Sequence, residues 1–291
     1  MAASTHPFLH VLQTRFNMPT PGREASFRNR PGWLNERFEL FEAYCLPSVG
    51  AQTVKAGRDF IWIIYFDKDT PAEFRERIER LREEVPFLPF YTGIFPSSGW
   101  PQSLRQTLGD LPPHVLTSRL DNDDALAFDY MERTATAARE ALAGGLVPDG
   151  TTCPRVGIVI TNGFIRSPAR AYSISHPCNV FASWLECSAD DARLKTALGI
   201  SHMAAEAEGP LVQVPGPGGW LQIIHGGNVS NKVRGRRISA SDLRSRFLPG
   251  ALAGLQPVGN ATLLAENLVV GPLRSLRDSL SATLQRLRRV G

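Results

Sequence analysis

The feature that most constrains the fold is the apolar run 60–66, which is enclosed by Asp59 and Asp67. A strand whose successive side chains are all apolar has both faces covered, as in a parallel sheet between two layers of helices. Related strands are predicted at 8–17 and 114–120, with helical periodicity between the strands. This alternation predicts an α/β fold with a doubly wound, mostly parallel sheet flanked by helices.

Other elements follow from the spacing of apolar residues and from turn residues. The expected helices are 33–46 ended by Pro47, 71–85 capped by Thr70, 102–109, and 125–143 closed by two glycines. The other expected elements are a strand at 87–95, a strand pair at 156–165 and 171–175, an apolar strand at 180–185, a hairpin of 211–214 and 220–225, and an amphipathic helix at 273–290.

Composition limits the classes of function. The chain has 291 residues, 43% of them hydrophobic, which is enough for one large domain with a sizeable core. Its net charge of +4 is small, and the basic excess lies late in the chain. This suits a small anionic ligand or an anionic membrane surface, and it argues against nucleic acid as a partner.

The cysteines and the amino-terminal segment bear on location. The four cysteines have no CxxC spacing and lie in mostly apolar contexts, which favours reduced thiols and a cytoplasmic protein. Residues 1–11 lack the basic and apolar regions of a signal peptide. No run approaches the roughly 18 apolar residues of a membrane span.

An acidic cluster follows the strand at 114–120, with Asp121, Asp123 and Asp124 within four positions. Ligands of open α/β sheets bind at the carboxyl ends of the strands, where this cluster falls. Two carboxylates there can hold Mn²⁺ or Mg²⁺, which in turn binds a diphosphate. The alternative is a helix cap, but a cap needs one carboxylate, and Asp124 alone would provide it.

Other polar residues are candidates for the same edge. Arg15 and Asn17 end the first strand and Asp67 ends the second, beside the place where a nucleotide would lie; each could instead be a cap or a surface ion pair. His225, before two glycines, is a candidate third metal ligand or a residue of a plain turn.

The basic run after it, with Lys232 and Arg234, suits phosphate oxygens or a solvated loop. Glu186, after an apolar run, is a candidate general base, and the alternative for it is an exposed acid at a helix start. His202 is interpreted as structural or substrate-lining.

Several motifs together resemble the rhamnosyltransferase family, bacterial glycosyltransferases with the GT-A type of fold. They are Thr14-Arg15-Phe16-Asn17, Trp33-Leu34 with Arg37 and Phe41, Pro47-Ser48 with Gln52-Thr53, Trp62 with Asp67, the stretch from Arg119 to Ala125, and the stretch from His225 to Ser230. The resemblance runs from Val11 to about Arg237 and is most specific at 118–125.

The resemblance implies a nucleotide-diphosphate sugar donor such as dTDP-rhamnose, and a divalent cation. In such enzymes the second Asp of the motif ligates the metal directly and the first lies nearer the ribose, which carries over to Asp123 and Asp121. A late His often completes the metal site, which favours His225. The matched motifs also place Thr14, Arg119 and Asn122 among the residues that bind the nucleotide sugar.

We therefore expect a metal-dependent glycosyltransferase with a GT-A-like fold that transfers a sugar, rhamnose in the family's reaction, to a hydroxyl of a glycan or small molecule. Residues 1–150 would bind the nucleotide sugar and 151–291, a mixed β/α half with the last helix, would bind the acceptor, within one continuous domain. One alternative is a metal-dependent nucleotidyltransferase or phosphohydrolase, and another is a non-catalytic nucleotide-sugar-binding protein. The arginine-rich face of the last helix would either be solvated or contact anionic lipid at the inner face of the membrane.

Overall fold

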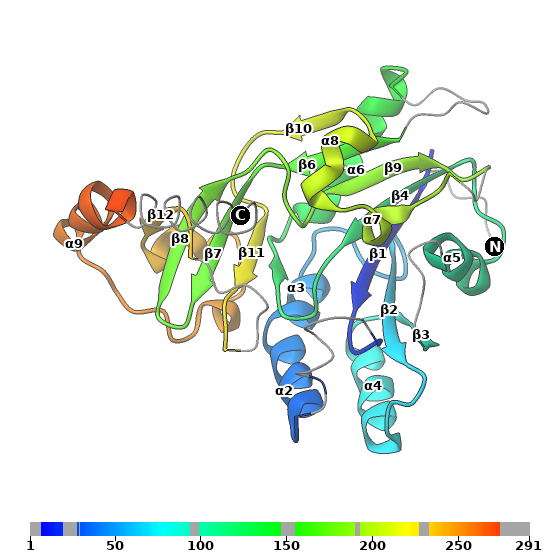
Figure 1. The fold of residues 1–291 in the computed structure, drawn as a ribbon, viewed down its shortest axis with the longest axis horizontal. Coiled ribbons are helices and arrows are strands. Elements are labelled where there is room, and N and C mark those ends of the chain that lie inside the picture. Colours follow the sequence, from blue (N-terminus) through cyan, green and yellow to red (C-terminus); the bar gives the residue numbers. More distant parts are fainter. Residues whose placement is uncertain are drawn as a thin grey trace, which may run out of the picture.

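The computed structural model describes residues 7–19, 28, 30–93, 99–146, 155–189, 193–226 and 233–273. In this part of the chain a seven-stranded sheet in the order β10-β6-β9-β4-β1-β2-β3 lies beside a five-stranded sheet in the order β12-β8-β7-β11-β5 (Figure 1). The strands of the larger sheet are β1 (Leu9–Arg15), β2 (Ile61–Asp67), β3 (Leu88–Thr92), β4 (His114–Arg119), β6 (Val156–Ile160), β9 (Ser183–Cys187) and β10 (Leu211–Val214).

The larger sheet is mostly parallel. β1 pairs in parallel with β2 and β4, β2 with β3, and β10 with β6. β9 runs in the opposite direction between β4 and β6. The carboxyl ends of β1, β2 and β4 therefore lie at one edge, as a doubly wound α/β sheet requires, and the predicted fold class is confirmed.

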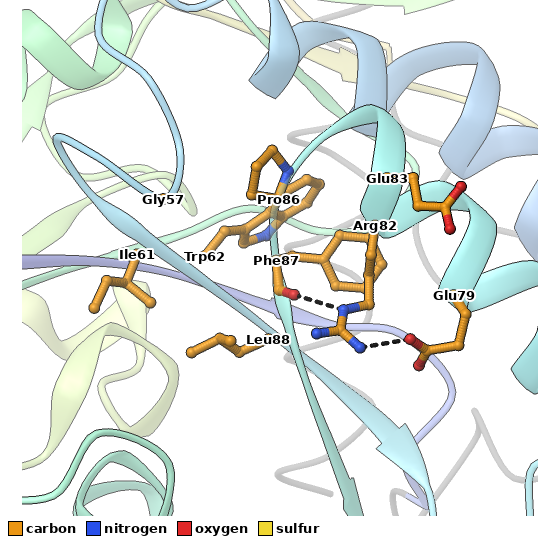
Figure 2. A pocket seen from close by; sticks show the side chains of 9 residues that line it. All are labelled: Gly57, Ile61, Trp62, Glu79, Arg82, Glu83, Pro86, Phe87 and Leu88. Atoms are coloured by element: carbon orange, nitrogen blue, oxygen red, sulfur yellow. Dashed lines mark hydrogen bonds and ion pairs between the residues drawn. The ribbon is translucent and has the colours of Figure 1, made fainter.

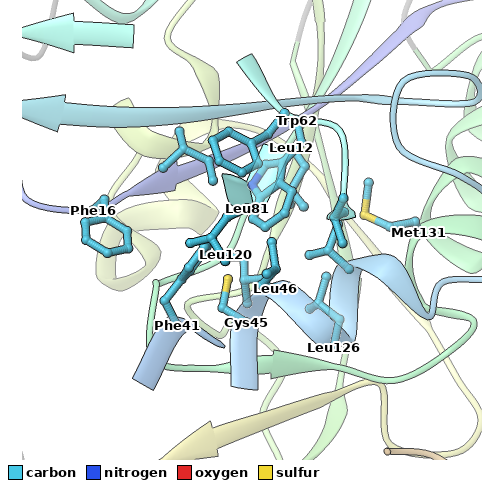
Figure 3. Packing of buried hydrophobic residues seen from close by; sticks show 14 of the residues in the cluster. Leu12, Phe16, Phe41, Cys45, Leu46, Trp62, Leu81, Leu120, Leu126 and Met131 are labelled. Atoms are coloured by element: carbon cyan, nitrogen blue, oxygen red, sulfur yellow. The ribbon is translucent and has the colours of Figure 1, made fainter. Parts of the chain in front are cut away.

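Helices cover both faces of the central strands. Successive side chains of a strand point to opposite faces, and in these strands the apolar side chains on both faces are buried. Leu12 and Trp62 pack against helical residues such as Phe41 on one face (Figure 3), whereas Val11 and Ile63 pack against Trp100 and Leu104 on the other. Each fully buried side chain of this kind contributes roughly 1.5–3 kcal/mol. The helices are α2 (Trp33–Leu40), the π-helical turn η1 (Phe41–Cys45), α3 (Leu46–Gly50), α4 (Ala72–Glu84), α5 (Trp100–Leu108), α6 (Tyr130–Ala143), α7 (Thr196–Gly199), α8 (Ala205–Glu208), α9 (Asn260–Ala265), the π-helical turn η6 (Glu266–Val270), and the 3₁₀ turns η3 (His202–Ala204), η4 (Ala240–Leu243) and η5 (Pro249–Leu252).

Two predicted helix boundaries are wrong. Pro47 does not end its helix, because it lies in the first turn of α3, where a missing N–H costs little, and the π-helical turn η1 joins α2 to α3. Thr70 does not cap α4: its hydroxyl donates to the carbonyl of Asp67 at 2.6 Å, and Pro71 precedes the helix.

The helix predicted from residue 125 begins five residues later, at Tyr130. Ala125 and Leu126 instead form the short strand β5 (Ala125–Leu126), which pairs antiparallel with Leu221 and Trp220. Their buried apolar side chains gain more from a sheet than from an exposed first helical turn, so tertiary packing overrides their helix propensity.

The second sheet takes its other strands from the later half of the chain, namely β7 (Asn162–Ser167), β8 (Arg170–Ser175), β11 (Trp220–Ile223) and β12 (Arg236–Ile238). The antiparallel pair of β7 and β8 confirms one predicted strand pair, whereas 156–160 of the same apolar run joins the larger sheet as β6. The predicted hairpin of 211–214 and 220–225 is wrong. β10 pairs with β6, β11 pairs with β7 and β5, and the Pro-Gly segment between them connects the two sheets.

The expectation of reduced cysteines fails at Cys187, which is disulfide-bonded; Cys45 and Cys178 are free and buried. Beyond Leu273, the predicted final helix lies outside the described residues. No helix within the described ranges is long and apolar enough to cross a membrane.

Candidate functional site

The polar ends of three parallel strands meet at one edge of the larger sheet. Gln13 of β1 is in register with Arg119 of β4, and Arg15 with Tyr65 of β2, so the residues that follow lie side by side. The acidic cluster therefore stands at the carboxyl edge, as the sequence predicts.

Asp123 and His225 come together across 102 positions of the chain. His225 Nε2 lies 2.9 Å from Asp123 Oδ2, and Arg37 NH1 of α2 lies 2.9 Å from the same oxygen. All three side chains are largely buried, with less than a fifth of each exposed. A guanidinium thus supplies the positive charge that the sequence argument assigned to a metal cation.

Asp121 has arginine partners of its own. Arg119 NH2 lies 3.0 Å from Asp121 Oδ1. Enclosure by the protein would raise the pKa of the Asp121 carboxyl, but the charges of Arg119, Arg15 and Arg37 outweigh it and hold that pKa below its usual value. Asp121 is therefore ionised at neutral pH.

Asp124 differs from its two neighbours. Its Oδ1 accepts the backbone N–H of Ile223 at 2.8 Å, which attaches the end of β11 to the cluster. Burial, and after it the charges of Asp123 and Asp121, raise the pKa of Asp124 well above its usual value. Asp124 is not a helix cap, because the residue before α6 is Asp129.

A pocket of about 400 Å³ opens beside the cluster, at the ends of β1 and β2. Asp67 Oδ2 lies 2.6 Å from Arg28 NH2, and Asn17 bridges the two strand ends by accepting the backbone N–H of Asp67 at 3.0 Å and donating to Thr70 at 3.1 Å. The pocket is lined by Asn17, Arg28, Trp33, Leu34, Asp67, Asp69, Thr70 and Pro71.

Trp33 connects this pocket to the acidic cluster. The guanidinium groups of Arg28 and Arg37 both lie over its ring, 5.8 and 5.6 Å from the centroid. Arg28 belongs to segment 18–32, which is polar, rich in Pro and Gly, and long for a plain connection, as ligand-binding loops often are. Arg37 as a charge partner was not predicted; its place on an amphipathic helix gave no such signal.

Two predicted nucleotide contacts are structural. Thr14 is fully buried and its hydroxyl accepts from Trp62 Nε1 at 3.0 Å, so the predicted contact of its side chain with a nucleotide is wrong. Asn122 is also buried, and its amide donates to the carbonyl of Phe16 at 2.9 Å, which holds the loops after β4 and β1 together.

Glu186 does not reach this edge, and its prediction as a general base is wrong. It is in register with Val115, six positions before Asp121, which is about 20 Å along a strand. The buried carboxylate accepts the backbone N–H groups of Lys195 and Thr196 at 3.0 and 2.9 Å and pairs with Arg155 at 3.2 Å. Burial raises the pKa of Glu186.

Of the late basic residues, Lys232 lies outside the described residues, and Arg234 is exposed in the segment before β12. Arg237 is buried, and its NH1 donates to the carbonyls of Ala171 and Ile238, both at 3.1 Å. It holds β12 in place and is not available to a phosphate.

A second pocket, of about 500 Å³, lies at the opposite edge of the larger sheet (Figure 2). Ile61 and Leu88, the first residues of β2 and β3, line it, so it is at the amino edge, away from the acidic cluster. Arg82 closes one wall by donating to Glu79 at 2.6 Å and to the carbonyl of Phe87 at 3.1 Å. This pocket is not part of the candidate site.

The donor atoms fit a cation that is shared with a substrate. Mg²⁺ sites of this type use one or two carboxylates together with substrate phosphates and water. Asp123 and His225 are two adjacent donors, whereas Asp121 is engaged by Arg119. No group of three His, Cys, Asp or Glu side chains among the described residues is arranged to hold a metal by itself.

A doubly wound sheet with acids at its carboxyl edge and an adjoining pocket is the arrangement of a nucleotide-utilising α/β enzyme. The profile of the family described as "Putative rhamnosyl transferase" matches residues 9–237. The chain belongs to this family. Comparison with curated proteins finds no match.

Solved structures give weaker similarities. Residues 1–349 of S. aureus TarS in complex with UDP-GlcNAc align with 10% identity over 84% of this chain and 68% of that chain, with a TM-score of 0.47. A longer S. aureus TarS structure aligns with 10% identity over 74% of this chain, with a TM-score of 0.41, and the match spans only 37% of its length. TM-scores below 0.5 do not establish a shared site.

Proposed function

We propose that the protein transfers rhamnose from a nucleoside diphosphate donor to a hydroxyl group of an acceptor. The observation that carries this proposal is the contact of Asp123 with His225 and Arg37 beside the pocket of Asn17 and Asp67. In this proposal the nucleoside lies in that pocket and the diphosphate lies over the acidic cluster.

The chain's own cations would hold the donor. Arg15 and Arg37 face the cluster from β1 and α2 and lie where the diphosphate charge would be. Trp33 lines the pocket, and its ring lies against the guanidinium groups of Arg28 and Arg37. A guanidinium binds phosphate through several fixed N–H donors, which suits this role.

We also propose a divalent cation, Mn²⁺ or Mg²⁺, held by Asp123 and His225 together with the donor's phosphates. Such a cation supplies Lewis-acid stabilisation of the departing diphosphate when it is bound. Arg37 shares the Asp123 carboxylate, so cation binding would have to displace that ion pair or use the other oxygen.

Two further proposals concern the rest of the chain. Residues 1–150 would serve the donor and 151–291 the acceptor. Contact with an anionic membrane from the cytoplasmic side is supported by an exposed apolar stripe made of Leu264, Leu268, Val269, Val270 and Leu273. The sequence that follows this stripe, 274–291, has five arginines and one aspartate, which equals the whole net charge of +4.

The test of the central proposal uses purified protein with dTDP-rhamnose and UDP-sugars, with and without Mn²⁺. The matching nucleotide should raise the melting temperature of the protein. With the matching nucleotide sugar, nucleoside diphosphate should be released over time. Asp123→Asn should lower that release at least 100-fold. Asp110→Asn is the matched control, because Asp110 is exposed just before the amino end of β4. Full activity of the Asp123 variant would refute the proposal.

The membrane proposal has a separate test. Full-length protein should sediment with vesicles containing phosphatidylglycerol and not with phosphatidylcholine alone. Leu264→Ser with Leu268→Ser should weaken this binding. Membrane contact is excluded if the wild-type protein stays in solution with both kinds of vesicle. It is also excluded if light scattering gives the molar mass of a dimer that the two serine substitutions dissociate.

A further inference from the structure

Because Glu186 lies at the wrong edge of the sheet, another group must accept the proton of the acceptor hydroxyl. The antiparallel direction of β9 decides where to look, since its amino end, not its carboxyl end, lies at the carboxyl edge of β4. Ser183, the first residue of β9, has its hydroxyl 2.6 Å from that of Ser118, just before Arg119. The segment leading into β9 therefore borders the acidic cluster.

This segment is held firmly in place. Asn179 Nδ2 donates to the carbonyl of Ile160, the last residue of β6, at 3.0 Å, and Asn179 Oδ1 accepts the backbone N–H of Phe181 at 3.0 Å. The backbone N–H of His176 donates to the carbonyl of Thr161 at 2.9 Å. Residues 176–181 thus form a fixed wall at the carboxyl edge of the larger sheet, beside the end of β6 and before β9.

His202 is attached to this wall. It begins the turn η3, whose preceding residue Ser201 accepts the backbone N–H of Met203 at 3.3 Å. The thiol of Cys178 donates to the carbonyl of His202 at 2.6 Å. These contacts attach His202 to the segment that leads into β9.

The imidazole of His202 is half-buried and has charged neighbours. Burial lowers its pKa, the charge of Arg119 lowers it further, Asp121 opposes this, and His176 again lowers it. The imidazole is therefore neutral at neutral pH and can accept a proton. Met203, the next residue, is 88% exposed, so this turn faces solvent, from which an acceptor can approach.

The two histidines of the site lie on different sides of the cluster. His225 comes from the end of β11 and is bound to Asp123, which also contacts α2 through Arg37. His202 comes from the β9 side, near Arg119 and Asp121. The donor's cationic partners are thus on one side and a free proton acceptor is on the other.

We infer that His202 is the general base that deprotonates the acceptor hydroxyl, an inference that rests on the proposed glycosyl transfer. In this step the acceptor oxygen forms a bond to C1 of the sugar. The bond from C1 to the phosphate oxygen breaks, and its electron pair leaves with the nucleoside diphosphate. The hydroxyl proton moves to a ring nitrogen of His202, so charge and atoms balance.

The test uses dTDP-rhamnose with water as the acceptor, because a base must also take a proton from water. His202→Gln and His202→Ala should slow nucleoside diphosphate release by 10²–10⁴-fold, the range for loss of a general base. Binding of dTDP, measured by calorimetry, should change by less than about threefold, since the donor side is untouched. Glu206→Gln is the matched control and should retain most of the rate, because Glu206 is an exposed residue of α8 near this turn.

A pH profile separates a base from a structural residue. In the wild type, kcat/KM should fall on the acid side as His202 gains a proton, and this limb should disappear in His202→Gln. The other charged or titratable groups near this turn are Arg119, Asp121, His176, Cys178 and Glu206. Of these, Glu206 is covered by the control.

The outcomes separate a failure of the proposed function from a failure of the role assigned to His202. If the wild-type protein neither binds dTDP nor releases it from dTDP-rhamnose, the proposed function fails. If the wild type turns over and His202→Gln keeps both the rate and the acid limb, the base is not His202. If His202→Ala does not fold, as judged by circular dichroism, the glutamine variant alone decides.

Discussion

The carboxylate of Asp124 accepts the backbone N–H of Ile223 at 2.8 Å, across 99 positions of sequence. Ile223 is the last residue of β11, and His225 follows two residues later. Asp124 therefore fixes the distance between the two sheets at the point where His225 meets Asp123.

We predict opposite results for two substitutions of Asp124. Asp124→Asn keeps an oxygen that can accept the N–H of Ile223, and it imitates the protonated carboxyl that the raised pKa implies. It should retain stability and donor release. Asp124→Ala removes the carboxylate that accepts that buried N–H and should cost about 1–3 kcal/mol in the free energy of unfolding. Urea unfolding measures both, and equal stability of the two variants would contradict the role given to Asp124.

Glu186 should prove to be structural. Glu186→Gln replaces one carboxylate oxygen with an amide that cannot accept the N–H of Lys195 or Thr196, and it removes one of the two negative partners of Arg155, which keeps Glu208. A buried N–H that loses its acceptor costs about 1–3 kcal/mol, so the melting temperature should fall. Donor release below the melting temperature should change less than about threefold. A loss of 100-fold without loss of folding would restore Glu186 as a base.

The error at Glu186 shows what the sequence can and cannot predict here. Continuous apolar runs identify β1, β2 and β4, and parallel strands end at one edge, so the positions of Arg15, Asp67 and Asp121 follow from the chain alone. The direction of β9 does not follow, because an apolar run of five residues reads the same in either orientation. Pairing with β4 and β6 sets the direction of β9. That direction decides whether a residue near the end of β9 lies at the carboxyl edge or at the amino edge of the sheet.

The charged partners of Asp121 and Asp123 cannot be predicted from the sequence for a related reason. Arg37 lies on α2 and His202 in a short turn, and only the packing of those elements on the sheet brings them to Asp123 and Asp121. The sequence correctly predicts crowded carboxylates that need positive charge. It does not say that arginines provide it, since a metal ion satisfies the same electrostatics.

Stability should rise with pH between about pH 3 and 6.5 because of His10. Burial, with a smaller contribution from Arg139, lowers the pKa of His10 to about 3, and its ring nitrogen lies 2.9 Å from the Ser118 hydroxyl. The unfolded chain binds a proton below its pKa of about 6.5 while the folded chain does not, so stability falls with acid in that window, by up to roughly 5 kcal/mol. Comparing urea unfolding at pH 5 and pH 7.5 checks this.

His10→Gln supplies the control for this pH effect, because glutamine cannot gain a proton. The variant should show a smaller loss of stability between pH 7.5 and pH 5 than the wild type. An unchanged pH dependence in the variant would mean that other groups cause the acid destabilisation.

Gly163 should not tolerate a side chain. An added Cβ would lie 2.1 Å from Trp220 Cδ2, while the Trp220 ring is stacked on Phe181 and its Nε1 donates to the carbonyl of Ile160 at 3.0 Å. The ring cannot move without loss of these contacts, so Gly163→Ala should destabilise the fold by about 1–3 kcal/mol or more.

The matched control for that substitution is Gly250→Ala, where a Cβ would meet nothing within 4 Å. Near-ultraviolet circular dichroism, which reports on tryptophan packing, should change in the Gly163 variant and not in the control. Equal spectra and equal stability of both variants would show that β11 adapts to the extra methyl group.

The separation of Asp123 from His225 by 102 residues has a consequence for the protein during its synthesis. A ribosome adds about 5–20 residues per second, so His225 is made roughly 5–20 s after Asp123. Until β11 pairs with β5 and β7, a nascent chain has its carboxylates but lacks the histidine beside them. The pocket at the ends of β1 and β2, where we propose that the nucleoside binds, can therefore form in a growing chain that does not yet contain His225.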